Sequence, residues 1–394
     1  MTAVVAAGEG VWTRVIGQPA VVQELRAAIA DPAAMTHAWL FTGPPGSGRS
    51  VAARAFAAAL QCPDGGDGTC HECRTALSGT HADLTVINPE GLSIGVDEAR
   101  DFVLGASRAP SQGRWQIIIV EDADRMTERA GNAVLKMIEE PPPRTVVMLC
   151  APSLHPDDIS ITIRSRCRLI SLRTPGVDAI AEVLVRSDGV DPALAAWSAA
   201  ASGGHVGRAR RLAHDEDARL SRKAVLDVPL SLVSLTACLD AAGNMLSAAE
   251  EERVSTIGDR DVTELEALKN SLGMGARGPG VVAANRGGAG RIKELEDRQK
   301  VRGKRIGRDS LDRALVDLAG LYRDAMVLAS APSAELPLNH PDRRADAAEL
   351  ARLLGPEGAL RRIDAILDCR TALEQNVKPQ IALEALTVAL RLPS

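Results

Sequence analysis

Residues 36–50 of this 394-residue chain read THAWLFTGPPGSGRS, and this stretch decides the fold class. Its first part, HAWLFTG, is apolar enough for a buried strand, and the residues after it, RSVAARAFAAAL (49–60), favour a helix. The glycine-rich turn GPPGSGRS (43–50) joins the two. This context is typical of the phosphate-binding loop G-x-x-x-x-G-K-[ST], in which backbone N–H groups at a helix N-terminus hold phosphate.

The loop departs from that pattern at one position. Gly43, Gly46 and Gly48 supply the glycines and Ser50 is placed to reach a magnesium ion, but Arg49 stands where lysine is expected. Arginine carries a broad planar fork and lysine a compact point charge, so lysine's reach between the β and γ phosphates would be lost. We therefore expect an inherited nucleotide loop with little or no ATP hydrolysis. Binding of ATP and Mg²⁺ without hydrolysis stays open at this point.

The loop belongs to a series of alternating strands and helices. Further strands are predicted at 83–88, 115–122 and 145–151, with helices at 96–105 and 128–140 between them. Near-continuous apolar strands that alternate with helices indicate a parallel sheet covered on both faces. The predicted fold class of the first 174 residues is α/β.

An acidic pair follows the third of these strands. Nucleotide hydrolases of this kind end the strand in Asp-Glu, where aspartate holds Mg²⁺ and glutamate activates water. Here the order is Glu121-Asp122, which shortens the general base by one methylene and misplaces it. A degenerate nucleotide site is one interpretation, and a solvated acidic strand end is the other.

Three cysteines lie in a polar loop at 62–81. Cys70 and Cys73 have the C-x-x-C spacing of half a zinc site, and Cys62 is a third candidate ligand. The candidates for a fourth ligand are Asp67, His71 and His81. A structural zinc and a set of reduced free thiols are both compatible with this pattern.

After residue 174 the sequence predicts helices only. Short helices are expected at 177–187, 192–201 and 205–213, and longer ones at 310–328, 358–376 and 379–391. A glycine- and arginine-rich segment, 271–308, interrupts them, and nine Lys or Arg face three acids between 286 and 308. We expect a flexible solvated insertion, the alternative being a basic contact for nucleic acid or an acidic partner.

Composition narrows the protein class. The net charge of −5 and the pI near 5.9 argue against a chain that coats nucleic acid along its whole surface. The N-terminal residues lack the basic and long apolar regions of a signal peptide, and no apolar run is long enough for a membrane span. We expect a cytoplasmic protein with reduced cysteines.

Several stretches together resemble the delta-prime family of bacterial DNA polymerase III clamp-loader subunits, in the AAA+ superfamily. The resemblance covers most of the chain, and the glycine-rich insertion resembles an actinobacterial variant. The stretches that carry it are VIGQPAVVQEL (15–25), THAWLFTGPPGSGRS (36–50), SGTHADL (78–84), IGVDEAR (94–100), IIIVEDADRMTERAGNAVLKMIEEPPP (117–143), RSRCR (164–168) and NVKPQIALEAL (376–386).

The resemblance implies a RecA-like domain at 1–174, a helical lid at 175–218 and a helical collar at 219–394 that joins subunits into a hetero-pentamer. It implies gamma/tau and delta subunits as partners, with the sliding clamp and primer-template DNA reached through the complex. Arg166, which in isolation is most simply a surface charge, would be an arginine finger for the ATP of a neighbouring subunit. Arg208 would match a nucleotide-sensing lid arginine, and Asp67 stands where the family has its fourth zinc cysteine.

Three functions compete at this stage. The first is a clamp-loader stator that helps load the sliding clamp in DNA replication, with little or no ATPase of its own. The second is an ATP-hydrolysing motor subunit, which Arg49 and the inverted acidic pair disfavour. The third is a nucleic-acid-binding protein that acts through 286–308, which the acidic chain and the lack of aromatics there disfavour.

Overall fold

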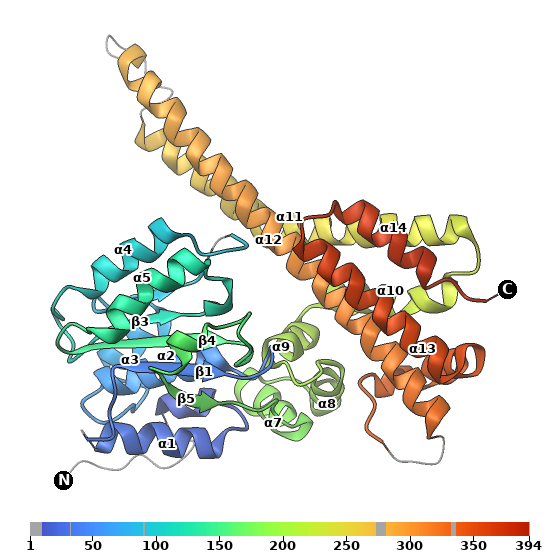
Figure 1. Ribbon diagram of the computed structural model, residues 1–394, viewed down its shortest axis with the longest axis horizontal. Helices are drawn as coiled ribbons and strands as arrows, with labels where there is room; N and C mark the ends of the chain where they lie inside the picture. The colour runs from blue at the N-terminus through green and yellow to red at the C-terminus, as the bar shows by residue number, and fades with distance from the viewer. Residues whose placement is uncertain (1–9, 32, 90, 273–280, 332–335, 394) are drawn as a thin grey trace. The chain divides into compact units, whose positions relative to one another are not determined.

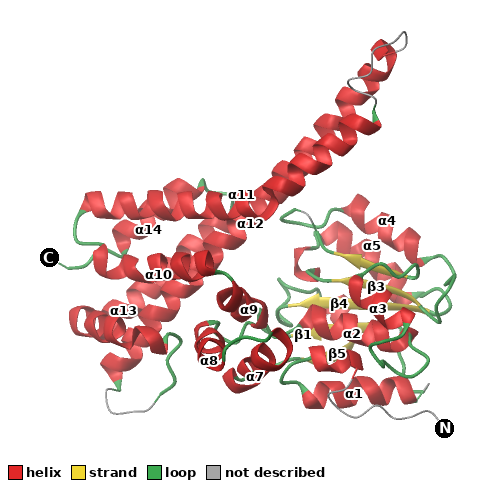
Figure 2. Cartoon of the chain, turned by 180° about the vertical axis from the view of Figure 1, so that it is seen from behind, coloured by secondary structure: helices red, strands yellow, loops and turns green. Residues whose placement is uncertain are grey.

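The computed structural model describes residues 10–31, 33–89, 91–272, 281–331 and 336–393, without the side chains of 281–287. The chain divides into two compact units, at 1–89 with 93–214, and at 90–92 with 215–394. The first unit holds the sheet and the second is helical (Figures 1 and 2). The expected fold class, a RecA-like α/β domain followed by helices, is confirmed.

The first unit is built on a five-stranded parallel sheet of order β2-β3-β4-β1-β5. Four strands lie where the sequence predicts them, and the fifth was not predicted. Their bounds are β1 Ala38–Thr42, β2 Leu84–Ile87, β3 Gln116–Val120, β4 Thr145–Ala151 and β5 Arg168–Ser171.

Helices cover both faces of the sheet because successive strand residues point to opposite sides. In β1, Trp39 and Phe41 pack into the core beneath α2 (Arg49–Gln61), whereas Ala38 and Leu40 pack into the core beneath α5 (Glu128–Glu139). The helices of this region are α1 Pro19–Ala30, α2 Arg49–Gln61, α3 His71–Ser78, α4 Val96–Ala106, α5 Glu128–Glu139 and α6 Ile161–Arg164, with 3₁₀ turns η1 Gly10–Arg14 and η2 Ala123–Arg125. Both faces of the sheet are therefore buried beneath helices, as the apolar strands predict.

Three short helices complete the first unit. They are α7 Val177–Asp188, α8 Pro192–Ala201 and α9 Val206–His214, each within two residues of its predicted bounds. Their own small core contains Ile180, Leu184 and Ala199. The boundary between the two units falls after His214, while the three-part division at 174 and 218 stays a prediction.

The second unit is a bundle of long helices. Leu311, Leu315, Leu318 and Tyr322 are buried on one face, as their spacing predicts. The helices are α10 Glu216–Ser231, α11 Leu235–Ser271, α12 Val281–Ser330, α13 Arg344–Glu374 and α14 Pro379–Ala389, with the 3₁₀ turn η3 Pro341–Arg343. The predicted helix at 358–376 is the second half of α13, which bends at Gly355 (φ +62°) before Pro356.

The expectation of a flexible segment at 271–308 is wrong for its described part. From Val281 this stretch is the first half of α12, which runs side by side with α11 (Figure 1). A glycine inside a helix costs about 1 kcal/mol relative to alanine. Contacts between the two helices offset this cost: Gly303, for example, gives room for the aliphatic part of Arg253. Residues 273–280 lie outside the described residues.

The helix predicted at 310–328 starts much earlier, because Ser310 lies inside α12 and its hydroxyl donates to Glu252 of α11. None of the helices in the described part of the chain combines the length and apolar character that crossing a bilayer requires.

Candidate functional site

The phosphate-type loop forms the turn between β1 and α2, as predicted. Gly46 and Gly48 have left-handed backbones (φ +85° and +91°), which a residue with a side chain rarely adopts. Gly48 caps α2, and the Ser47 N–H donates to the Pro44 carbonyl over 3.0 Å. The loop has therefore kept the backbone shape that presents N–H groups at a helix N-terminus.

Arg49 is turned back onto its own loop. Its guanidinium Nη1 donates to the carbonyl oxygen of Gly43, the first residue of the loop. The side chain is only half-buried, but one of its N–H groups is satisfied inside the protein. The guanidinium of arginine spreads its N–H donors over a planar fork, whereas lysine has one compact ammonium group. In Arg49 one arm of this fork is turned to the loop carbonyl.

The acidic pair lies at the carboxyl end of β3, and each of its carboxylates faces an arginine of the chain. Glu121 Oε1 accepts from Arg54 Nε over 2.7 Å, and both side chains are mostly buried. Asp122 lies 3.7 Å from Arg125 Nε. The sequence analysis missed Arg54, which lies in α2 about one turn after the loop and matches no motif there.

Nearby titratable groups show that the loop and the acidic pair share one electrostatic environment. Burial raises the pKa of the Cys150 thiol, in β4, well above its usual range. Glu121 and Asp122 raise it further, while Arg49 and a hydrogen bond with Ser50 act in the opposite sense. Ser50, which was predicted to bind magnesium, thus lies beside a buried thiol.

The start of α9 also lies against the loop. A Cβ atom added to Gly46 would come within 2.6 Å of the Cβ of His205, so α9 approaches the loop backbone directly. The Arg208 N–H donates to His205 Nδ1 over 3.2 Å, which sets Arg208 in the first turn of α9. The structure therefore brings the first turn of α9, which carries Arg208, to the glycine-rich loop. The close contact at Gly46 was not predicted.

Arg166 has a different environment from Arg49. It lies between α6 and β5, its side chain is 40% exposed, and Nε pairs with Glu139 at the end of α5 over 2.8 Å. Its Nη1 also donates to the Thr162 carbonyl over 3.1 Å. Nη1 also lies 3.3 Å from the Ser165 hydroxyl, and all of these contacts are at the surface.

The neighbouring arginines have different partners. Arg164 donates to the Leu154 carbonyl over 3.1 Å. Arg168 pairs with Glu24 over 3.0 Å and lies 5.0 Å from the centre of the Trp39 ring. The side chain of Arg168 is 36% exposed, close to the 40% of Arg166, but the ring contact also holds it in place. Arg168 is thus fixed by a ring contact as well as an ion pair, whereas Arg166 is held by polar contacts at the surface.

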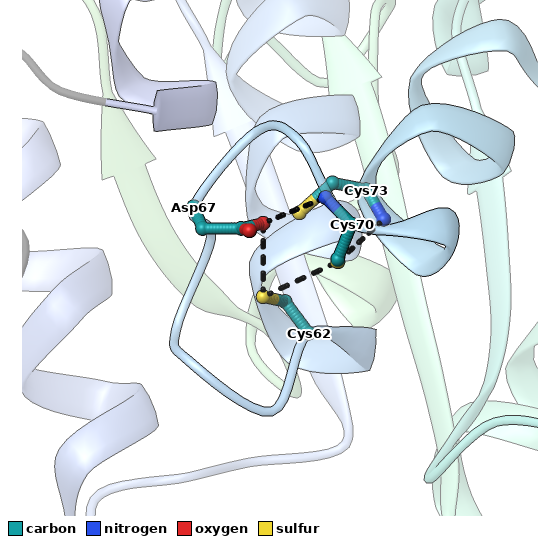
Figure 3. A group of neighbouring side chains, drawn as sticks. All are labelled: Cys62, Asp67, Cys70 and Cys73. Atoms are coloured by element: carbon teal, nitrogen blue, oxygen red, sulfur yellow. Dashed lines mark hydrogen bonds between the residues drawn. The ribbon is translucent and has the colours of Figure 1, made fainter.

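The cysteine loop folds into a compact cluster. Potential ligand atoms of Cys62, Asp67, Cys70 and Cys73 all lie within 4.8 Å of one another (Figure 3). Cys62 ends α2, and Cys70 caps α3, so two helix ends and the loop between them supply the four groups. The structure thus brings Asp67 into the position of fourth ligand.

The donor set fits a tetrahedral zinc ion, since three thiolates and one carboxylate are ligands that zinc accepts. Backbone N–H groups of Asp64, Gly68 and Cys73 donate to the sulfurs over 3.3–3.4 Å, as expected around sulfurs that carry negative charge. Burial raises the pKa of the Cys70 and Cys73 thiols, so a bound cation would be needed to hold them as thiolates.

The two histidine candidates are not part of this cluster. His81 has both ring nitrogens engaged, one with Glu72 Oε2 over 2.5 Å and the other accepting from the Asp83 N–H over 3.0 Å. His71 is exposed at the first position of α3. Spacing alone had left Asp67, His71 and His81 open, and the fold selects Asp67.

The chain is similar in sequence to a known protein family. Residues 17–176 match the family described as DNA polymerase III, delta subunit. The chain is 35% identical over 212 residues to DNA polymerase III subunit delta' of Pseudomonas aeruginosa, which is 52% of this chain and 64% of that one. It is 31% identical to the delta' subunit of Bacillus subtilis, over 53% of this chain and 63% of that one.

A second group of relatives carries another subunit name. The chain is 31% identical over 345 residues to DNA polymerase III subunit gamma/tau of Mycobacterium tuberculosis, which is 79% of this chain and 57% of that one. The chain thus spans somewhat less than two thirds of the length of each of these relatives.

Proposed function

The chain belongs to the delta-prime family of clamp-loader proteins in the AAA+ superfamily, and from that premise we propose that it is a clamp-loader subunit whose Arg166 completes the ATP site of a neighbouring subunit. In this function it helps to load a sliding clamp onto primed DNA within a complex that contains gamma/tau and delta subunits. Its own nucleotide loop hydrolyses little or no ATP.

The observation that carries the proposal is the position of Arg166, whose side chain lies between α6 and β5 and is 40% exposed. Arg166 is accessible at the end of α6, and its ion pair with Glu139 is between two half-exposed side chains. Such a pair contributes at most about 1 kcal/mol, so exchanging it for a phosphate costs little. An arginine that stabilises charge on a transferring phosphoryl group is worth about 10³-fold or more in rate.

The loop geometry supports the absence of hydrolysis. A catalytic glutamate must activate water, but Glu121 is engaged with Arg54. A loop lysine would contact the β and γ phosphates, but Arg49 donates to Gly43. If zinc is bound, Cys62, Asp67, Cys70 and Cys73 would hold it, and its contribution would be to fix the ends of α2 and α3.

A motor subunit is the competing function, and the long match to gamma/tau proteins favours it. That function requires the chain's own loop to hydrolyse ATP. Steady ATP turnover by the purified chain, abolished by Ser50→Ala, would establish the motor function and overturn the stator proposal.

The test of the proposal uses the complex reconstituted with its gamma/tau and delta partners. We expect Arg166→Ala to leave assembly intact and to slow single-turnover ATP hydrolysis at the served site by about 10³-fold. Arg186→Ala is the matched control, since Arg186 is an exposed arginine with one exposed glutamate partner. Full hydrolysis in the assembled Arg166→Ala complex would contradict the proposal.

A further inference from the structure

Glu139, the last residue of α5, is the acidic partner of Arg166. Its Oε1 lies 2.8 Å from the arginine Nε, and the Glu139 side chain is 48% exposed. The proposed function assigns no task to this carboxylate. Because an exposed ion pair adds little to stability, the need to hold the fold together does not explain the pair.

The backbone that carries Glu139 is fixed by its neighbours in α5. Ile138 is buried in the core beneath the helix, and its carbonyl accepts from Nε2 of His37 over 2.7 Å. The N–H of Glu140 donates to the Lys136 carbonyl over 3.0 Å, which completes the last turn. The end of α5 therefore holds Glu139 at a defined place.

The backbone of Arg166 is anchored in the same core through α6. Ile163 of α6 is buried with Ile138 in that core. The Ser160 hydroxyl caps α6 by accepting from the Ile163 N–H over 3.3 Å, and the Arg166 N–H donates to the Ile163 carbonyl over 3.1 Å. Two segments that share one core thus bring the carboxylate and the arginine together.

Three contacts set the orientation of the Arg166 guanidinium. Glu139 holds Nε, whereas Nη1 donates to the Thr162 carbonyl over 3.1 Å and to the Ser165 hydroxyl over 3.3 Å. The guanidinium is rigid and planar, so fixing two of its three nitrogens also fixes the third. In the described part of the chain no hydrogen bond engages Nη2. Nη2 is therefore the donor left for a phosphate oxygen of another molecule.

We propose that Glu139 is a positioning residue, which holds Arg166 in the orientation that reaches the γ-phosphoryl group of the neighbouring subunit's ATP; this inference rests on the proposed function. Exchange of the ion pair for a phosphate costs little, but the geometry does not require it, because the carboxylate uses Nε and leaves Nη2. Without Glu139, only the contacts of Nη1 remain to orient the side chain. Misplacing a catalytic group by about 1 Å can cost about 10²-fold in rate.

The carboxylate also has an opposing effect, because its negative charge weakens the attraction of the guanidinium for a phosphate. This effect alone would make Glu139 an inhibitory partner, whose removal speeds hydrolysis. Water screens the charge of a side chain that is 48% exposed, whereas the orientation that a hydrogen bond imposes is not screened. We therefore expect the orienting effect to be the larger one, so that removing Glu139 slows hydrolysis.

The test measures single-turnover ATP hydrolysis at the served site, in the complex reconstituted with gamma/tau and delta partners. We expect Glu139→Ala to assemble normally, to slow hydrolysis about 10-fold and to leave the ATP affinity within about twofold, because orientation matters in the transition state. Glu139→Gln keeps an oxygen that accepts from Nε and should restore the rate to within about threefold of the unaltered complex. Glu140→Ala is the matched control: Glu140 is the adjacent exposed glutamate and has no ion pair in the part of the chain that the structure describes.

A double variant shows whether Glu139 acts through the arginine. In the Arg166→Ala background, Glu139→Ala should slow hydrolysis no further, because the arginine it orients is already absent. A further loss in that background, an unchanged or faster rate with Glu139→Ala alone, or no recovery with Glu139→Gln would overturn the proposal. If Arg166→Ala slows hydrolysis and Glu139→Ala does not, the role of Glu139 fails while the proposed function holds. If Arg166→Ala leaves hydrolysis intact, both fail.

Discussion

The phosphate-type loop and the segment at 164–168 both depend on arginines, and the protein uses them in opposite ways. Arg49 bonds within its own loop, and Arg54 neutralises Glu121 beside it. Arg166 is exposed at the surface and has an ion pair that a partner could replace at little cost. The comparison suggests that inward-facing charges in this unit stabilise the fold, whereas the outward-facing arginine serves a partner.

The largest stability effect should come from the cysteine cluster, whose donor atoms all face inward. If it holds zinc, Cys73→Ser should abolish stoichiometric zinc and lower the free energy of unfolding by about 3 kcal/mol, or roughly 10 °C in melting temperature. Metal analysis and calorimetry measure the two effects. Asp64→Ala, in the same loop, is the control and should change neither. Unchanged stability after zinc removal by a chelator would show that the cluster is only a set of thiols.

Asp83 is the next inward-facing charge. Its buried carboxylate accepts N–H groups from Ser111, Gln112 and Gly113 over 2.6–2.7 Å. Burial by itself would raise the pKa of Asp83, but these donors outweigh it and hold the pKa at about 2, below the usual 3.8. Asp83→Ala should therefore cost about 2 kcal/mol in unfolding free energy, because three buried N–H groups lose their acceptor.

The same group predicts a pH dependence. Since the pKa is lower in the folded state, its contribution of about 2 kcal/mol is present above pH 3.8 and is lost as the pH falls towards 2. Denaturant titrations from pH 5 to pH 2 should show a steeper loss of stability in the unaltered chain than in Asp83→Ala. Parallel pH profiles would show that Asp83 is not the group responsible.

The smallest effect should come from Arg54. Arg54→Ala leaves the mostly buried Glu121 without its nearest cation and should cost about 1–2 kcal/mol of unfolding free energy. We expect no change in ATP turnover by the assembled complex, because Glu121 is not a general base here. The control Arg100→Ala breaks a pair of exposed side chains and should change stability by less than about 0.5 kcal/mol. If Arg54→Ala increased ATP hydrolysis by the assembled complex, Glu121 could act as a general base once released. That result would contradict a purely structural role for the Arg54–Glu121 pair.

How far the sequence predicts this structure depends on whether a feature is local. The turn at 43–50 and the apolar strands at 83–88 and 145–151 are local patterns, and all were found. β5 was missed because Arg168–Ser171 is four residues long and follows an arginine-rich stretch, so it becomes a strand only by pairing with β1. The glycines and arginines of 271–308 predicted a flexible segment, but in its described part pairing with α11 overrides that preference.

The candidate site divides in the same way. Arg49, Ser50 and the acidic pair follow from a motif. Arg54 contacts Glu121, and His205 contacts the loop at Gly46, through tertiary contacts that no spacing predicts. Among the proposed ligands, Cys70 and Cys73 are a local pattern. The choice of Asp67 required the fold, because His81 is engaged with Glu72 and the Asp83 backbone.

The most direct test of the comparison places the two arginines side by side in the reconstituted complex. ATP hydrolysis would be measured with Arg49→Ala in one preparation and Arg166→Ala in another, after both are shown to assemble. We predict that Arg49→Ala leaves the rate within about twofold, while Arg166→Ala slows the served site by about 10³-fold. The opposite result, a loss with Arg49→Ala and an unchanged rate with Arg166→Ala, would contradict the assignment of the two roles.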